Sequence, residues 1–132
     1  MTSNKLSGLS AFMIGISIAF GAMGAHALEK VFSTHYLEVW KTACLYFALN
    51  GLGLMAVANS GLYAQWVAEK SSTWFVKSIV FGAMIFSISL WIVAFNEQVS
   101  PMLKKIAIIT PFGGIAMIVG WLVLGWRFWK NK

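Results

Sequence analysis

Four long stretches without Asp, Glu, Lys or Arg constrain this chain more than any other feature. A helix needs about 20 mainly apolar residues to cross the ~30 Å hydrocarbon core of a bilayer, and each stretch is at or near that length. The stretches are continuously apolar rather than alternating, which favours helices over barrel strands. The predicted membrane-spanning segments are approximately residues 6–28, 43–65, 75–96 and 105–127.

The spanning segments leave little of the 132-residue chain for anything else. The connections between them are short, so neighbouring helices must run antiparallel. We therefore predict a single all-α transmembrane domain, a four-helix bundle over residues 1–132. The first segment is longer than the roughly 7 to 15 apolar residues of a signal peptide, so we expect it to be retained as a helix.

Charged residues are scarce and cluster near the ends of the predicted segments. A net charge of +6 would suggest nucleic acid as the partner of a soluble chain, but these cations lie where they can meet anionic lipid head groups. We therefore expect membrane lipids, and no nucleic acid, as partners. The side of the two termini carries Lys5, Lys70, Lys77, Arg127, Lys130 and Lys132, and the opposite side carries Lys30, Lys41, Lys104 and Lys105. By the positive-inside rule this distribution favours both termini in the cytoplasm.

Aromatic and small residues give two further predictions. Small residues recur at four-residue spacing in the first segment, as Ala11, Gly15 and Ala19, and such rows let helices approach closely in lipid. Tryptophans near the segment ends are typical of anchors in the head-group layer. The tryptophans interpreted in this way are Trp40, Trp66, Trp74, Trp121, Trp126 and Trp129.

Polar side chains inside the predicted segments are few. They are Asn50 in the second segment, Ser87 and Ser89 in the third, and Thr110 in the fourth. Interhelical hydrogen bonds are the simplest role for such residues. No acid or base lies deep in a segment, which weighs against an ion-coupled carrier.

The sequence GAMGAH, residues 21–26, ends the first segment with small residues and a histidine. We expect His26 to bond a backbone carbonyl or a neighbouring helix and fix the helix end. The alternative is a metal or pH-sensing site with Glu29, His35 and Glu38, although their spacing matches no known ligand pattern.

The sequence TPFGG, residues 110–114, places a proline and two glycines near the start of the fourth segment. This pattern favours a kinked and tightly packed helix, and the alternative is a broken helix that lines a transport site. No nucleophile with a neighbouring base, phosphate loop or haem-ligating histidine pair occurs. The sequence therefore predicts no enzymatic activity and indicates no catalytic residue, metal or cofactor.

Several blocks, taken in order, resemble a known family. They are residues 21–28 (GAMGAHAL), residues 40–43 (WKTA) leading to Tyr46, residues 86–90 (FSISL), and residues 110–114 with Gly120 and Trp121. Together they resemble the YgdD-like family of small inner-membrane proteins, domain of unknown function 423, to which human transmembrane protein 256 is related. The resemblance implies a four-helix protein of the bacterial cytoplasmic membrane, and it implies no reaction.

The chain departs from that family at two elements. Relatives usually have Gln after the tyrosine and His three residues further on, where this chain has Phe47 and Asn50. In the FSGSLY element, Ile88 replaces Gly and Trp91 replaces Tyr. If the family has a polar site between its first and second helices, this chain has lost part of it.

These observations favour a non-enzymatic membrane protein that acts through helix packing. It would be an accessory subunit of a larger membrane complex, a self-associating protein or a membrane-integrity factor. One alternative is a small transporter or channel for a neutral or lipidic molecule, and another is a metal- or pH-sensing membrane protein. The candidate functional or packing residues are Gly21, Gly24, His26, Tyr46, Asn50, Ser87, Ser89, Thr110, Pro111, Gly113, Gly114 and Gly120.

Overall fold

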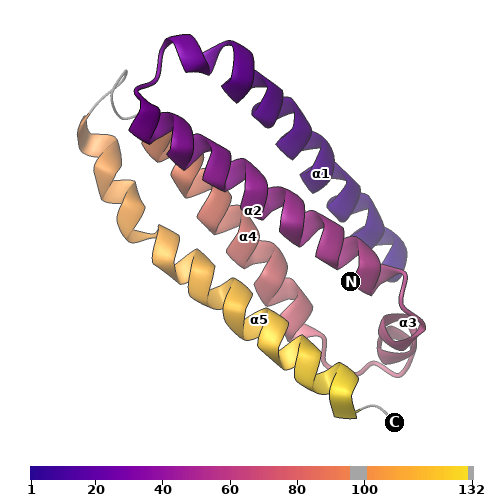
Figure 1. Cartoon of the computed structure of the whole chain (residues 1–132). Helices are drawn as coiled ribbons and strands as arrows, with labels where there is room; N and C mark the ends of the chain where they lie inside the picture. Colours follow the sequence, from indigo (N-terminus) through magenta and orange to yellow (C-terminus); the bar gives the residue numbers. More distant parts are fainter. Residues whose placement is uncertain (96–100, 131–132) are drawn as a thin grey trace.

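The computed structural model describes residues 1–95 and 101–130, apart from the side chains of residues 101–104. Its helices in chain order (Figure 1) are α1 (Ser3–His26), η1 (Leu28–Lys30), α2 (Thr34–Ala58), α3 (Gly61–Ala68), α4 (Trp74–Ala94), η2 (Pro101–Ile108) and α5 (Thr110–Lys130). The η labels denote short 3-10 helices. The described part of the chain contains no strand, so the all-α prediction is confirmed.

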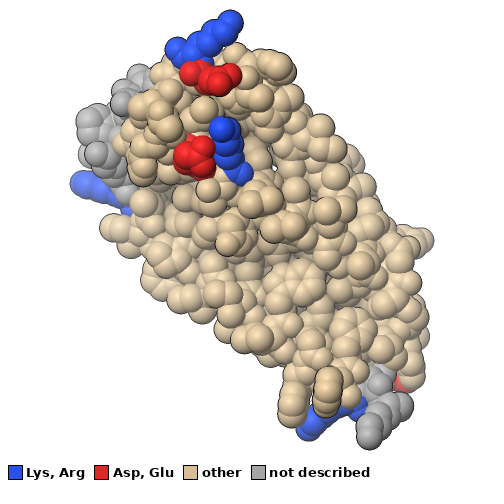
Figure 2. Space-filling model, viewed as in Figure 1, with Lys and Arg blue, Asp and Glu red and all other residues tan. Residues whose placement is uncertain are grey.

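Four segments are long and apolar enough to cross a bilayer. They are Ser3–Lys30, Thr34–Ala58, Trp74–Ala94 and Lys105–Lys130. On the face shown in Figure 2, the Lys, Arg and Glu side chains lie towards the two ends of the molecule, and the surface between them carries none. This uncharged belt suits the hydrocarbon core of a membrane, and the predicted bundle of four membrane helices is confirmed.

The four long helices pack in the spatial order α1, α2, α4, α5 (Figure 1). α1 packs on α2, α2 on α4 and α4 on α5, so α2 and α4 form the central pair and α1 and α5 lie on opposite sides of it. Successive long helices run in opposite directions, as their short connections require. Because α5 packs mainly on α4, the space between α2 and α5 is bridged by side chains.

Glycines bring the backbones of α4 and α5 into direct contact. A Cβ atom added to Gly113 would lie 2.6 Å from the backbone nitrogen of Phe86, and one added to Gly82 would lie 2.7 Å from the Gly113 carbonyl oxygen. Pro111 is the second residue of α5, where its missing N–H costs no helical hydrogen bond. The alternative of a broken helix is not found within α5, because Pro111 lies in its first turn and the helix continues to Lys130.

The helix boundaries differ from the predicted segments. The second segment, 43–65, crosses a helix end: α2 begins at Thr34 and ends at Ala58, and Ser60 then caps α3 by accepting a 3.2 Å hydrogen bond from the Tyr63 N–H. The apolar run did not give the start of α2, because the charged Glu38 and Lys41 lie on its exposed first turns. It did not give the end either, because the break at 59–60 lies within the apolar run. The third segment ends at Asn96, which lies outside the described residues.

The short helix α3 joins the two ends of the chain. The Tyr63 hydroxyl donates a 2.8 Å hydrogen bond to the Met1 carbonyl oxygen. The Trp66 ring packs against Phe128 of α5, and the Arg127 guanidinium lies 5.6 Å from the Trp66 ring centroid. Both termini therefore lie at the α3 end of the bundle.

Candidate functional site

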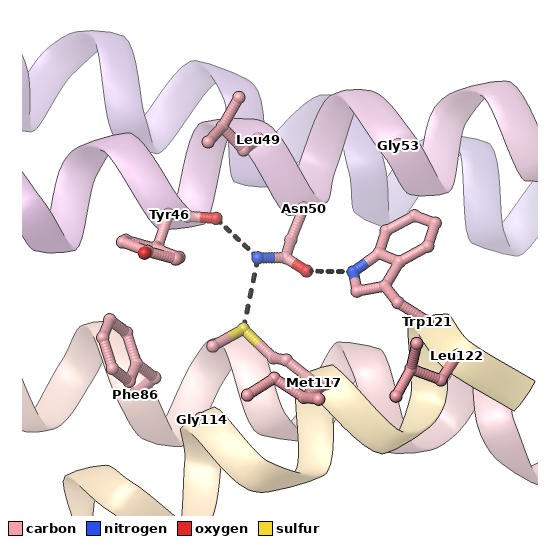
Figure 3. A pocket seen from close by; sticks show the side chains of 10 residues that line it. Tyr46, Leu49, Asn50, Gly53, Phe86, Gly114, Met117, Trp121 and Leu122 are labelled. Atoms are coloured by element: carbon pink, nitrogen blue, oxygen red, sulfur yellow. Dashed lines mark hydrogen bonds between the residues drawn. The ribbon is translucent and has the colours of Figure 1, made fainter.

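A groove runs between α2 and α5 over the side of α4. Its cavity has a volume of about 670 Å³. One face of α2 forms one wall and one face of α5 forms the other (Figure 3). The lining residues are Tyr46, Leu49, Asn50, Gly53, Phe86, Gly114, Met117, Ile118, Trp121 and Leu122.

Asn50 is the polar centre of the groove and is only 5% exposed. Its Nδ2 donates to the Tyr46 carbonyl oxygen at 2.8 Å and to the Met117 Sδ at 3.2 Å. Its Oδ1 accepts a 2.8 Å hydrogen bond from the Trp121 indole N–H (Figure 3). An unpaired amide in an apolar medium costs several kcal/mol, and these bonds satisfy the Asn50 amide. The bonds to Met117 and Trp121 also join α2 to α5.

Gly53 makes room for the Trp121 indole beside Asn50. A Cβ atom at Gly53 would lie 2.5 Å from Cη2 of that ring, closer than any side chain could tolerate. On the opposite wall, a Cβ atom at Gly114 would meet only the Phe86 ring, at 3.7 Å. The two glycines therefore differ. The Trp121 ring occupies the space beside Gly53, whereas the space beside Gly114 remains open in the groove.

Tyr46 and Phe86 form the aromatic end of the groove. Their ring centroids are 5.0 Å apart. The Tyr46 side chain is 43% exposed, and within the described part of the chain its hydroxyl has no hydrogen-bond partner. The Tyr46 phenol therefore lines the groove, and among the described residues its O–H has no acceptor.

The groove lies near the middle of the membrane. Tyr46 is the midpoint of α2, and Trp121 is one residue from the midpoint of α5. At about 1.5 Å per residue, Asn50 is only ~6 Å along the helix from the middle of α2. The prediction that Trp121 anchors the chain in the head-group layer is therefore wrong, because its indole is bonded at mid-depth instead.

The other predicted anchors divide into two groups. Trp74, Trp126 and Trp129 are exposed near helix ends, as anchors should be. Trp40 and Trp66 also lie near the ends of the bundle, but both rings are buried against other aromatic rings.

Gly24 of the GAMGAH segment lies beneath the Trp40 ring. A Cβ atom at Gly24 would lie 2.8 Å from Cδ1 of Trp40, whose indole N–H donates a 2.7 Å hydrogen bond to the Phe20 carbonyl oxygen. Gly21 has nothing within 4 Å of its Cβ position, and His26 is exposed. Among the described residues, no three His, Cys, Asp or Glu side chains gather closely enough to hold a metal ion.

The serines of α4 hydrogen-bond to the neighbouring helices. Ser87 donates to the Ala43 carbonyl oxygen of α2 at 3.1 Å, and the hydroxyls of Ser89 and Thr110 are 2.7 Å apart. Gly120 packs on α4, where an added Cβ atom would lie 2.8 Å from the Phe75 carbonyl oxygen. These residues and Gly113 lie in the helix contacts, whereas Pro111 is exposed at the start of α5, and none of them lines the groove.

Of the candidate residues named from the sequence, Tyr46, Asn50 and Gly114 line the groove. Phe86, Met117 and Trp121 also line it but were not among those candidates. Asn50 was expected to form an interhelical hydrogen bond, and its side chain bonds Met117 and Trp121 of α5. One face of a helix would carry Tyr46, Leu49, Asn50 and Gly53, which are three or four residues apart. This spacing was the signal in the sequence for one wall of the groove. Nothing in the sequence indicated which helix that face meets.

Comparison with known proteins identifies relatives of this chain. Residues 20–114 match the family described as "Protein of unknown function (DUF423)". The match contains α2, α4 and the first turn of α5, so it includes most of the groove. No solved structure matches the chain significantly.

Curated relatives are similar over most of their length. UPF0382 membrane protein SSP2132 of Staphylococcus saprophyticus is 37% identical over 90% of this chain and 89% of its own. UPF0382 membrane protein YwdK of Bacillus subtilis is 32% identical, with 83% of each chain covered. UPF0382 membrane protein C1782.12c of Schizosaccharomyces pombe is 29% identical over 83% of this chain and 88% of its own.

Proposed function

Because this chain belongs to the DUF423 family, whose function is unknown, we propose one from the groove: a non-enzymatic membrane protein that holds the apolar chain of a lipid between α2 and α5. Retention of lipid at this position makes the protein a membrane-integrity factor. The family is one of membrane proteins, and the proposal specifies what this member does in the bilayer.

The groove itself supports the proposal. Its volume of about 670 Å³ lies within the range of small-molecule sites, ~300–1,000 Å³. Leu49, Ile118 and Leu122 form an exposed apolar rim, with Leu122 69% exposed. In a bilayer the surroundings at this depth are acyl chains, so a lipid chain can enter from the side.

The chemistry of the lining favours binding over catalysis. The ten lining residues that the structure describes include no Asp, Glu, His, Lys or Cys, the side chains that most often act as acids, bases or nucleophiles. Transport is also less favoured, because the cavity reaches Asn50 but is lined by neither His26 nor Thr110.

Native mass spectrometry of protein released from mild detergent tests lipid retention. We expect one lipid to remain bound to the wild-type protein. Gly114→Leu fills the open side of the groove and should remove this adduct. The control is Gly21→Leu, since Gly21 is on α1, outside the groove, with nothing within 4 Å of its Cβ position. A bare wild-type protein, or equal adducts in both variants, would contradict the proposal.

For location, we propose the cytoplasmic membrane of a bacterium with both termini in the cytoplasm. The described cations at the α3 end are Lys5, Lys70, Lys77, Arg127 and Lys130, and those at the other end are Lys30, Lys41 and Lys105. Lys132 and the side chain of Lys104 lie outside the described residues. Fusion of alkaline phosphatase to the C-terminus should give no activity, whereas a fluorescent protein at the same place should be bright. The opposite pattern would reverse the orientation.

The exposed face of α1 supports a second candidate function, association with another membrane protein or a second copy. Gly8, Ala11, Gly15 and Ala19 are all exposed along this face, and Gly8 and Gly15 have nothing within 4 Å of their Cβ positions. Small-residue faces of this kind promote close helix packing in lipid. Blue-native electrophoresis would show a complex for wild type that Gly15→Leu disrupts, and an unchanged lone species would count against this candidate.

A further inference from the structure

We propose that the lipid held between α2 and α5 is a quinone with an isoprenoid tail, its ring at Tyr46 and Asn50 and its tail along the rest of the groove. This inference rests on the proposed lipid-binding function and names the class of lipid. Four features of the groove carry it: the depth of its polar groups, the donors left for a ligand, its aromatic walls, and an apolar extension on one side.

Depth separates quinones from ordinary phospholipids. Asn50 follows Lys41 by nine residues, ~13.5 Å along α2, so its amide lies near the centre of the ~30 Å hydrocarbon core, with Tyr46 ~6 Å from it along the helix. The ester and phosphate groups of a phospholipid lie at the interface, roughly 15 Å from that centre. A saturated acyl chain offers no hydrogen-bond acceptor at this depth. A quinone is a wholly membrane-soluble lipid whose carbonyl ring can lie there.

Two hydrogen-bond donors face the groove from one side of α2. The Tyr46 hydroxyl has no acceptor in the described part of the chain, and an unmet hydroxyl in an apolar medium is costly. One N–H of Asn50 is given to the Met117 thioether, which is a weak acceptor. Residues four apart lie on the same helix face, so both donors can reach one carbonyl-bearing ring.

The walls around these donors suit a flat ring. Tyr46, Phe86 and Trp121 surround the polar part of the groove with aromatic side chains. Gly114 on the opposite wall has no side chain, which leaves space beside the Phe86 ring. Aromatic rings pack well against a planar conjugated ring in offset or edge-on geometry.

An apolar pocket continues the groove towards the α3 end of the bundle. It has a volume of about 360 Å³ and shares Gly53 and Trp121 with the main cavity. Its other lining residues are Ala56, Val57, Leu124, Gly125 and Phe128. This second pocket has no polar side chain except the shared indole, so it suits an isoprenoid tail.

Fluorescence quenching in vesicles tests quinone binding directly. The full chain is reconstituted into phosphatidylcholine vesicles and titrated with a short-chain benzoquinone, and the tryptophan emission is followed. We expect saturable quenching of this emission at low mole fractions of quinone. Tyr46→Phe should weaken binding about five- to tenfold, the range expected for one hydrogen bond of about 1 kcal/mol.

The control for that substitution is Tyr36→Phe, which makes the same change on α2 outside the groove lining. Its quinone binding should equal that of wild type. Non-saturable quenching, or equal affinities for Tyr46→Phe and wild type, would overturn the inference.

Native mass spectrometry keeps this inference distinct from the proposed function. Should a phospholipid adduct be retained and lost in Gly114→Leu, while quinone gives no saturable quenching, then the groove binds lipid but not quinone. If neither assay detects a ligand, both proposals fail. A quinone adduct that survives detergent and disappears in Gly114→Leu supports both.

Discussion

The Trp121 indole N–H and the Asn50 amide oxygen are joined by a 2.8 Å hydrogen bond across the space between α5 and α2. α5 packs mainly on α4, and α2 packs on both α1 and α4, so the bond fixes the width of the groove at the middle of the membrane. Each partner depends on the other, since Trp121 can only donate and the amide oxygen can only accept. The pair therefore controls both the stability of the bundle and the shape of its binding groove.

A double-mutant cycle measures that bond. Asn50→Leu and Trp121→Phe should show a coupling free energy of about 0.5–1.7 kcal/mol, the range found for interhelical hydrogen bonds in membranes. Unfolding in mixed micelles, followed by circular dichroism, gives the four free energies. Trp129→Phe serves as the control because Trp129 is 81% exposed, and its coupling to Asn50→Leu should be close to zero. A coupling near zero for the Trp121 cycle as well would show that this hydrogen bond does not stabilise the contact between α2 and α5.

Two glycines of α5 should respond in opposite ways to the same substitution. Gly120→Ala places a Cβ atom 2.5 Å from Cγ1 of Ile79 and 2.8 Å from the Phe75 carbonyl oxygen, so α4 and α5 must separate. We expect a loss of about 1–3 kcal/mol in the free energy of unfolding, as for other overpacked cores. Gly125→Ala meets nothing within 4 Å and should be neutral or slightly stabilising, because alanine favours the helix. Equal effects in thermal denaturation would contradict the close packing of α4 on α5.

Apolar runs and short connections were sufficient to predict the fold, because a chain in lipid must satisfy its backbone within each helix. They could not locate the start of α2, since a helix can extend beyond the hydrocarbon core and carry charged residues there, as Glu38 and Lys41 do. The break before α3 was missed for a related reason, because Asn59 and Ser60 interrupt a stretch without charge.

The groove was harder to predict than the helices. Asn50 was identified as a polar residue inside the membrane, but its partners Met117 and Trp121 are 67 and 71 residues away in sequence. Helix periodicity defines a face of α2 and a face of α5 separately. Which faces meet depends on the packing of α4 between them, where Gly82 and Gly113 set the contact.

The GAMGAH segment offers a third test, again with two glycines. Gly24→Ala would bring a Cβ atom within 2.8 Å of the Trp40 ring and displace its indole from the Phe20 carbonyl oxygen. We expect a red-shifted tryptophan emission and a lower unfolding temperature. Gly21→Ala, in open space three residues earlier, should leave both unchanged. If the two variants behave alike, then Gly24 is not the platform on which Trp40 packs.

High pH should weaken the contact between α3 and the N-terminus. Burial raises the pKa of Tyr63 above its usual value of 10.0, and the neutral hydroxyl donates to the Met1 carbonyl oxygen. The folded state therefore holds this proton more tightly than the unfolded state does. Its contribution to stability is complete below the unfolded pKa and is lost as the pH rises through the folded one.

Tyr63→Phe isolates this effect from the lysines that titrate in the same range. Between pH 9 and pH 11, about one unit either side of the tyrosine reference value, wild type should lose more unfolding free energy than the variant. The variant should be the less stable protein at pH 8, since it lacks the bond to Met1. Parallel profiles for wild type and Tyr63→Phe would show that ionisation of Tyr63 does not act on the fold.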